Sequence, residues 1–206
     1  MLTLNLSVSE RRLRMAKKES TFMSMVLTLL IVTLVASAAL GYIYEITKGP
    51  IAASKLAKLN NAIKQVVPEY DTIPGDEVYK MGIDGDTLVF YPAKKDGELV
   101  GTAISTFTNK GFGGNIKLMV GLLPDGTINN ISVLEHKETP GLGDKMSKKK
   151  SEWSIQFNGK NPSDFKLKVT KDGGDVDAIT ASTISSRAFC DAVERAHKAY
   201  MEGGKK

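Results

Sequence analysis

The chain has few of the residues that build disulfides, metal sites and nucleic-acid surfaces. Its 206 residues include one cysteine, Cys190, so no disulfide can form within the chain. The two histidines, His136 and His197, have no partner at the spacing of metal ligands. We therefore expect no metal site.

Basic charge is not spread along the chain, although the formal net charge is +5. Residues 1–20 account for +3 of it, and residues 21–44 carry no charge. The nearly neutral remainder contains few aromatic residues, whereas a protein that binds DNA or RNA usually carries a basic patch. No nucleic-acid partner is expected.

The chain does contain one long uncharged segment, TFMSMVLTLLIVTLVASAALGYIY, at residues 21–44. At about 1.5 Å per helical residue, residues 22–44 are long enough to cross a hydrocarbon core of roughly 30 Å. Tyr42 and Tyr44 fall where aromatic residues gather at a membrane interface, and the basic cluster before the segment favours a cytoplasmic amino terminus. We predict a single-pass anchor in the lipid bilayer, with residues 1–21 cytoplasmic and the remaining chain on the outer face.

A cleaved signal peptide is the alternative interpretation of this segment. Ala36-Ser37-Ala38 has the small residues of a cleavage site, but the apolar run continues to Tyr44, beyond what a signal peptide needs. Both interpretations put the later residues on the same side of the membrane. A lipoprotein anchor is excluded because no cysteine follows the segment closely.

Residues 45–80 are expected to contain a linker helix that leads out of the membrane, followed by the entry to a folded domain. Apolar residues recur near helical spacing and the pattern ends at Pro68; they are Ile51, Leu56, Leu59, Ile63 and Val66. The pattern fits packing on the domain and contact with a partner equally well.

Residues 81–206 have the pattern of a single α+β domain, with an antiparallel sheet and flanking helices. Turn signals such as Asp84-Gly85, Asp96-Gly97 and Pro124-Asp125-Gly126 separate short alternating runs at residues 87–91, 98–107, 115–123 and 127–135. These runs predict a meander of strands. The third run places Ile116, Leu118, Val120 and Leu122 on one face.

Two more elements are predicted nearer the carboxyl end. Residues Asp164–Thr170, DFKLKVT, have the alternation of another strand. A final helix is expected to begin near Thr183 or Ser185, with an inner stripe of Phe189, Val193, Ala196 and Tyr200.

Two glycine-rich loops interrupt these elements. NKGFGGNI, residues 109–116, lacks the Gly-Lys-Ser/Thr ending of a phosphate-binding P-loop, and by itself it indicates a turn. In HKETPGLGDKM, residues 136–146, Pro140 fixes φ while Gly141 and Gly143 free the backbone on each side of Leu142. Leu142 either faces a flat aromatic ligand, whose polar edge Glu138 and Thr139 would bond, or packs into the protein's own core.

Hydroxyl side chains are crowded into DAITASTISSRAF, residues 177–189. The N-terminus of a helix offers unpaired N–H groups and about half a positive charge, which suits a phosphate. Thr180, Ser182 and Thr183 would present hydroxyls at that point. Ordinary capping of the helix is the alternative.

The segment Asp177 to Thr183 resembles the flavinylation motif of the FMN-binding domain family. That motif runs Asp, a variable pair, Ser or Thr, Gly or Ser, Ala, then Thr; its usual Gly-Ala is Ala181-Ser182 here. GFGGNI, a meander strand, a DG turn and ETPGLG precede it in the order that the family shows, so the resemblance extends over nearly the whole chain. With one anchor and this length, the chain is similar to G subunits of Rnf electron-transport complexes and to their relatives, the C subunits of sodium-pumping NADH:quinone oxidoreductases.

The resemblance implies an FMN-binding domain at residues 81–206 and roles for particular residues. The FMN phosphate would be joined to Thr183 as a phosphoester by a separate flavin transferase that uses FAD. Ser182 would add a hydroxyl beside the attachment site, while Asp177 and Thr180 would position the phosphate loop and present it to the transferase. The residues implied to line the isoalloxazine ring are Glu138, Thr139, Gly141, Leu142 and Gly143.

The implied function is that of a membrane-anchored flavoprotein in the inner (cytoplasmic) membrane, with its FMN domain on the periplasmic face. It would relay electrons within an Rnf complex that couples electron transfer between ferredoxin and NAD to Na⁺ or H⁺ export by other membrane subunits. It would have no complete activity alone and no catalytic residue beyond the flavin. The alternatives are the FMN-binding subunit of a sodium-pumping NADH:quinone oxidoreductase, a stand-alone reductase, and a non-redox anchored module that binds a ligand or partner.

Overall fold

The computed structural model describes residues 21–71, 75, 77–83 and 85–203. Contacts divide the chain into two units, residues 1–53 and residues 54–206. The basic segment expected at residues 1–21 lies outside the described residues, except for Thr21. Asp84 of the expected Asp84-Gly85 turn also lies outside them.

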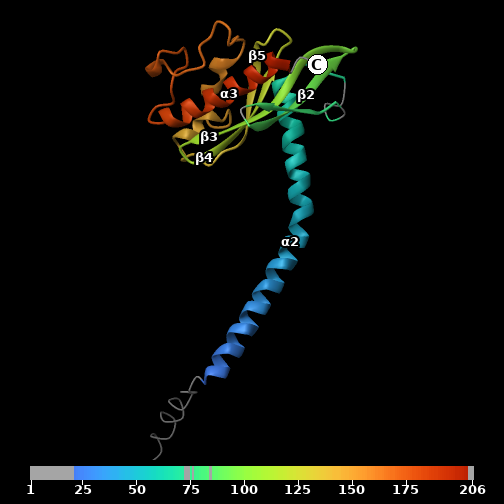
Figure 1. Cartoon of the computed structure of the whole chain (residues 1–206), viewed down its shortest axis with the longest axis vertical. Helices are drawn as coiled ribbons and strands as arrows, with labels where there is room; N and C mark the ends of the chain where they lie inside the picture. Colours follow the sequence, from blue (N-terminus) through green and yellow to red (C-terminus); the bar gives the residue numbers. More distant parts are fainter. Residues whose placement is uncertain (1–20, 72–74, 76, 84, 204–206) are drawn as a thin grey trace, which may run out of the picture. The chain divides into compact units, whose positions relative to one another are not determined.

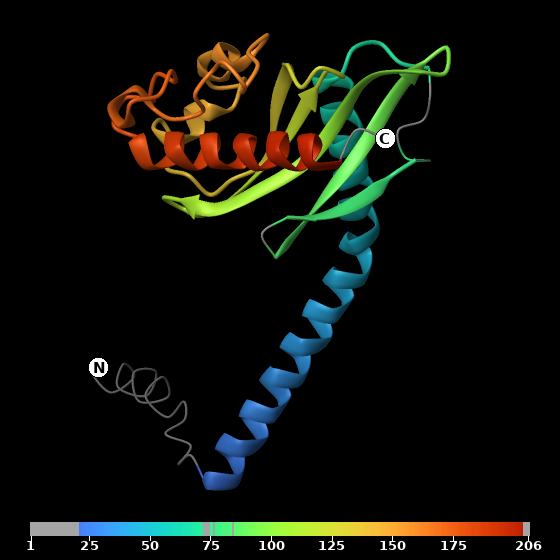
Figure 2. The ribbon, with the colours of Figure 1, turned by 45° about the horizontal axis from the view of Figure 1, so that its top comes forward.

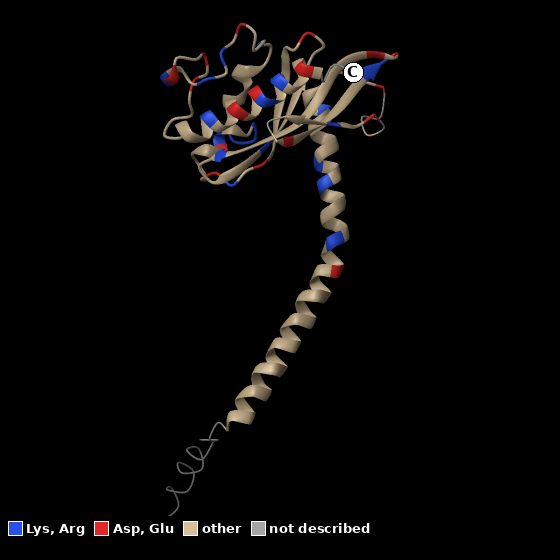
Figure 3. Cartoon of the chain, viewed as in Figure 1, with Lys and Arg blue, Asp and Glu red and all other residues tan. Residues whose placement is uncertain are grey.

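Helix α2 (Phe22–Val66) begins with the uncharged segment, which Figure 3 shows without basic or acidic residues. Its large apolar side chains from Phe22 to Ile46 are exposed, so this part has no protein core to pack against. The hydroxyls of Thr28 and Thr33 donate to the carbonyls of Ser24 and Leu29 at 2.7 and 2.9 Å, which satisfies them within the helix. Among the described residues, this is the one helix long and apolar enough to span a membrane.

An antiparallel five-stranded meander forms the centre of the second unit (Figure 1). The strands follow one another in the sheet in chain order. They are β1 (Tyr79–Ile83), β2 (Asp86–Lys95), β3 (Glu98–Gly111), β4 (Gly114–Leu122) and β5 (Ile128–Glu135). The predicted α+β class and antiparallel sheet are therefore confirmed.

The first two strands differ from the sequence prediction. Strand β1 was not predicted, although its five residues, YKMGI, alternate between less and more exposed positions. Strand β2 was expected to end at Tyr91 but continues through Pro92 to Lys95. Proline is tolerated there because β1 pairs only with residues 86–90, so Pro92 faces no partner strand on that side.

Each face of the sheet is covered by a different helix. Helix α3 (Thr183–Gly203) lies along one face (Figure 2), where its predicted stripe from Phe189 to Tyr200 is fully buried. The predicted inner face of β4, with Ile116, Leu118, Val120 and Leu122, belongs to the same core. On the opposite face the end of α2 packs through Ala62, Ile63 and Val66 against residues that include Ala103 and Met119.

The prediction of a strand at Asp164–Thr170 is wrong, because the structure has no strand there. Leu167 and Val169 are buried as an alternating pattern requires, but the segment pairs with the chain that follows it rather than with the sheet. Val169 forms an isolated parallel bridge with Val176, and short 3-10 helix η3 (Thr170–Asp172) makes the connection. Burial against a local turn gives the same period of two as a strand.

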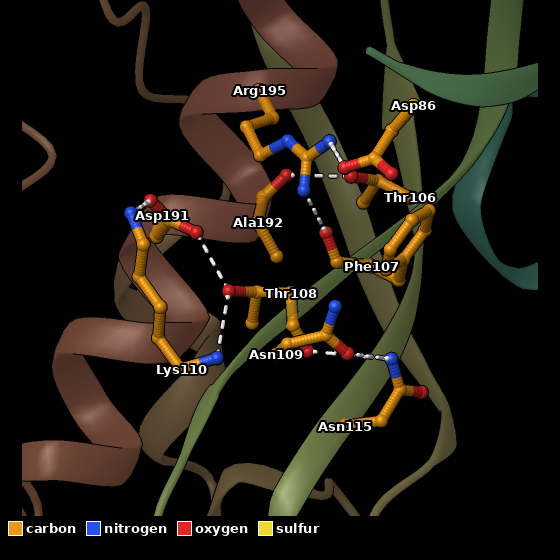
Figure 4. Close-up of polar contacts among 10 residues, drawn as sticks. All are labelled: Asp86, Thr106, Phe107, Thr108, Asn109, Lys110, Asn115, Asp191, Ala192 and Arg195. Carbon is orange, nitrogen blue, oxygen red and sulfur yellow. Dashed lines mark hydrogen bonds and ion pairs between the residues drawn. The ribbon is translucent and has the colours of Figure 1, made fainter. Parts of the chain in front are cut away.

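Hydrogen bonds and an ion pair hold α3 against strands β3 and β2 (Figure 4). Thr108 donates its hydroxyl to Asp191 at 2.6 Å, and Thr106 donates to the carbonyl of Ala192 at 2.9 Å. Arg195 donates to the Phe107 carbonyl at 2.9 Å and to Asp86 at 2.6 Å. These contacts attach the middle of α3, at residues 191–195, to the sheet.

Candidate functional site

A tight turn precedes α3 and carries two of the hydroxyls singled out from the sequence. The Ser182 N–H donates to the carbonyl of Ile179 at 2.9 Å, which closes a four-residue turn over Thr180 and Ala181. Ser182 is the residue before the helix, and its carbonyl accepts the N–H of Ser186 at 3.0 Å. The first N–H groups of α3 therefore begin at Thr183 and have no acceptor within the helix.

Hydrogen bonds hold this turn in place from two sides, and those of Ser186 are buried. The Ser186 hydroxyl accepts the Ile179 N–H at 2.9 Å and donates to the Ser182 carbonyl at 3.0 Å. On the other side the indole N–H of half-buried Trp153 donates to the carbonyl of Asp177 at 2.6 Å. The Asp177 side chain is exposed, so this residue is held by its backbone rather than by its carboxylate.

The second predicted loop reaches the same place. Leu142 is 39% exposed, which excludes the interpretation that it packs into the protein's own core. The loop turns back on itself, since the Leu142 N–H donates to the Thr139 carbonyl at 3.2 Å. Glu138, at the start of the loop, is buried.

A pocket of about 350 Å³ lies where these segments meet. This volume is near the lower end of the range of about 300–1,000 Å³ found for small-molecule sites. The pocket brings together six residues singled out from the sequence: Glu138, Thr139, Leu142, Gly143, Ser182 and Thr183. Asp177, Thr180 and Gly141 do not line it; all three are exposed.

Four lining residues were missed by the sequence analysis: Phe112, Ala181, Ile184 and Ser185. Phe112 lies in the first glycine-rich loop, which indicates a simple turn when considered alone. Three glycines around one aromatic residue were a signal that this turn carries an exposed ring. Ile184 and Ser185 lie within the hydroxyl-rich stretch, next to Thr183.

Of the four hydroxyl side chains that line the pocket, exposed Thr139 lies in the loop, and the other three lie at the start of α3 and differ in burial. Ser182 and Ser185 are only 7% and 2% exposed, and the Ser185 hydroxyl donates to the Glu138 carboxylate. Thr183 is half-buried, at the first position of α3. Among these three, Thr183 is the most accessible hydroxyl, and it lies at the positive end of the helix.

The rim of the pocket is apolar. Phe112, Leu142 and Ile184 are 70%, 39% and 49% exposed, although each is a large hydrophobic side chain. Exposed apolar side chains grouped around a pocket suit the face of a flat ring, whereas single scattered ones need no explanation. An accessible hydroxyl, a helix N-terminus and an apolar rim together fit a phosphorylated aromatic cofactor such as FMN.

Outside the pocket, one buried cysteine and the distribution of possible metal ligands bear on further sites of chemistry. Burial raises the pKa of the Cys190 thiol to about 12, so this thiol stays protonated and unreactive. Within the described part of the chain, no three His, Cys, Asp or Glu residues are grouped as a metal site requires.

Comparison with known proteins agrees with this geometry. Residues 111–198 match the FMN-binding domain family, a range that includes every residue lining the pocket. The chain is 35% identical to the G subunit of the ion-translocating oxidoreductase complex of Shewanella amazonensis, over 79% of this chain and 80% of that one. It belongs to the family of these G subunits.

Two further members of the family have a comparable similarity to this chain. The corresponding G subunit of Erwinia tasmaniensis is 37% identical, over 82% of this chain and 84% of that one. That of Vibrio cholerae is 35% identical, over 82% and 86%. The resemblance to the FMN-binding domain family and to the Rnf G subunits is therefore confirmed.

Proposed function

We propose that this protein carries FMN, joined covalently through its phosphate to Thr183, and relays electrons within an Rnf-type ion-translocating ferredoxin:NAD oxidoreductase. The observation that carries the proposal is the position of Thr183. This half-buried residue lies at the N-terminus of α3 and lines a pocket with an apolar rim. Membership of the family of G subunits supports the electron-transfer role, because its relatives are named as subunits of oxidoreductase complexes.

Attachment would proceed by phosphoryl transfer from FAD, brought by a flavin transferase. The Thr183 Oγ1 forms a bond to the FMN phosphorus of FAD, the pyrophosphate bond to the adenylate breaks, and AMP leaves. The hydroxyl proton passes to a base of the transferase or to solvent. No electrons are exchanged in this step.

The chain's own residues would bind and orient the cofactor. The free N–H groups at the start of α3 would hold the phosphate, and the helix dipole would stabilise its charge. Thr139 would bond the polar edge of the ring, while Leu142 would pack on its face and Gly141 and Gly143 would keep the loop backbone close. When bound, FMN supplies the electron-transfer chemistry itself.

Exposure suggests a different role for Asp177 and Thr180. Both lie outside the pocket on the surface of the segment that precedes α3. They would present this segment to the transferase rather than contact the ring. Ser182, buried before Thr183, would cap the helix.

The apolar start of α2 would anchor the protein in the inner membrane, with the FMN domain on the periplasmic face. The other membrane subunits of the complex would be its partners and would carry the Na⁺ or H⁺. Residues 21–44 contain no charged side chain, and ion paths through a membrane usually require polar or ionisable groups. This protein would therefore supply electron transfer, with no complete activity of its own.

The proposal predicts covalent flavin that depends on Thr183. The full chain is produced in a membrane together with a flavin transferase, denatured, and examined by in-gel fluorescence and intact mass. The wild type should be fluorescent and heavier by one FMN adduct, whereas Thr183→Val should be dark and show the mass of the bare polypeptide. Only a covalently bound flavin remains with the chain after denaturation.

Thr170→Val is the matched control, because Thr170 is exposed, lies outside the motif at residues 177–183 and does not line the pocket. It should carry the adduct at the wild-type level. An adduct of unchanged intensity in Thr183→Val would overturn the assignment. Co-purification with Rnf subunits, as opposed to subunits of a sodium-pumping NADH:quinone oxidoreductase, would identify the complex.

A further inference from the structure

Glu138 has a buried carboxylate, and both of its oxygens accept hydrogen bonds from the protein. The residue is only 5% exposed. Oε1 accepts the backbone N–H of Gly113 at 2.9 Å, and Oε2 accepts the hydroxyl of Ser185. An ionised carboxylate only accepts hydrogen bonds, so these two donors match its two oxygens.

Two glycines, Gly111 and Gly143, leave space for this carboxylate because they have no Cβ. A Cβ at Gly111 would lie 2.6 Å from Oε1, and a Cβ at Gly143 would lie 2.8 Å from Oε2. Carbon atoms do not approach oxygens this closely, so a side chain at either position would displace the carboxylate. Three separate segments therefore meet at Glu138: the turn between β3 and β4, its own loop, and the first turn of α3.

Each of these contacts is made next to an exposed apolar residue. Phe112 precedes Gly113, Leu142 precedes Gly143, and Ile184 precedes Ser185. Phe112, Leu142 and Ile184 form the apolar rim of the pocket, and they come from segments far apart in the sequence. The carboxylate is thus hydrogen-bonded to the segments of Phe112 and Ile184, and Glu138 itself belongs to the loop of Leu142.

We infer that Glu138 is a positioning residue, which acts on the cofactor through the rim rather than by bonding the edge of the ring. Hydrogen bonds to a charged acceptor are stronger than neutral ones, and a fully satisfied buried network fixes a single arrangement. The carboxylate would hold the three apolar side chains at the spacing of a flat ring. This inference rests on the proposed binding of FMN for its consequence, but its structural part is independent of the cofactor.

The structural part is tested on the full chain without flavin by hydrogen exchange of three hydrogen-bonded amides, one from each segment: Gly113, Leu142 and Ser186. Glu138→Gln keeps the shape of the side chain but replaces one acceptor oxygen by an NH₂ donor. Exchange at these three amides should become faster by roughly tenfold, because the hydrogen bonds to a charged carboxylate are replaced by weaker ones to a neutral amide. Ser185→Ala removes a single contact and should produce a smaller increase, so it tests the inference even if Glu138→Gln folds poorly.

The consequence is tested on the flavin-loaded chain by time-resolved fluorescence anisotropy. Glu138→Gln should retain the covalent adduct by intact mass, but a fast rotation of the ring should appear that the wild type lacks. Phe112→Ala should have the same effect directly, and since Phe112 is 70% exposed its truncation should leave the fold intact.

Thr106→Val is the matched control, because it removes a buried hydroxyl contact of α3 with the sheet outside the pocket. It should lower stability without changing exchange at the rim or rotation of the ring. Equal amide exchange in wild type and Glu138→Gln would overturn the inference whether or not flavin is present. A wild type that carries no adduct would instead contradict the proposed function and leave the exchange result standing.

Discussion

At residue 181 the backbone adopts a conformation that an L side chain disfavours. Ala181 has φ of +59°, in the left-handed region, at the third position of the turn from Ile179 to Ser182. Glycine is preferred at such a position because it has no Cβ. This gives a physical reason for the glycine that the flavinylation motif usually has here, and it means that this chain holds backbone strain beside its candidate attachment residue.

Ala181→Gly should therefore stabilise the domain. Relief of the left-handed alanine, reduced by the greater freedom of glycine in the unfolded chain, should raise the free energy of unfolding by about 1 kcal/mol. Chemical denaturation of the purified protein measures the change. Ala178→Gly, in the same segment but without a positive φ, should lower the stability instead, and a gain of equal size there would contradict the explanation.

At the scale of elements, an ion pair joins the segment before the site to α3. Arg187, one turn beyond Thr183, donates to Asp172 of η3 through two nitrogens at 2.6 and 2.7 Å. The hydrogen bonds from Arg187 lower the pKa of the Asp172 carboxyl from its usual value of 3.8. The pair therefore links the 3-10 helix to the helix that carries the hydroxyls.

The lowered pKa of Asp172 gives a pH dependence with a definite sign. Its contribution to stability is present above the unfolded value of 3.8 and is lost as the pH falls through the lower, folded pKa. Asp172→Asn should thus lower the thermal midpoint at neutral pH, and the difference from wild type should disappear in strong acid. Thermal unfolding followed at a series of pH values tests this. Arg187→Lys, which keeps the charge but not the two-pronged contact, should lose less.

At the scale of the whole molecule, the start of α2 differs from the folded domain because its apolar side chains are exposed. Its exposed apolar side chains contrast with the end of the same helix, where Ala62, Ile63 and Val66 are buried on the sheet. The sequence change at Glu45, where charged residues reappear, falls between these two environments. One helix therefore contains a segment suited to lipid and a segment suited to protein.

The full chain should stay in the membrane fraction after alkaline washing, with an intact mass that includes residues 1–44. Leu30→Arg with Val32→Arg should prevent stable insertion, since each arginine at the centre of a span costs about 2.5–3.5 kcal/mol. The double variant Lys149→Arg with Lys150→Arg, in the domain, is the control and should not change the partition. A mature chain beginning after Ala38 would instead show the cleaved signal peptide.

The sequence alone determined the features that depend on near neighbours along the chain. The periodic runs of β3, β4 and β5, the buried stripe of α3 and the long apolar segment each follow from spacing within a few residues. The order of ETPGLG and the hydroxyl-rich stretch was sufficient to indicate the family. Local regularity gave a false strand at Asp164–Thr170, whose alternation arises from a local turn, and it did not identify β1 or the end of β2.

The tertiary structure alone decided how the site is assembled. It placed Phe112 beside Leu142 and Ile184, assigned both oxygens of Glu138 to protein donors, and distinguished accessible Thr183 from buried Ser182. These contacts join residues that are far apart in the sequence. They depend on how the sheet and α3 pack together, and no periodic pattern within a single segment contains that information.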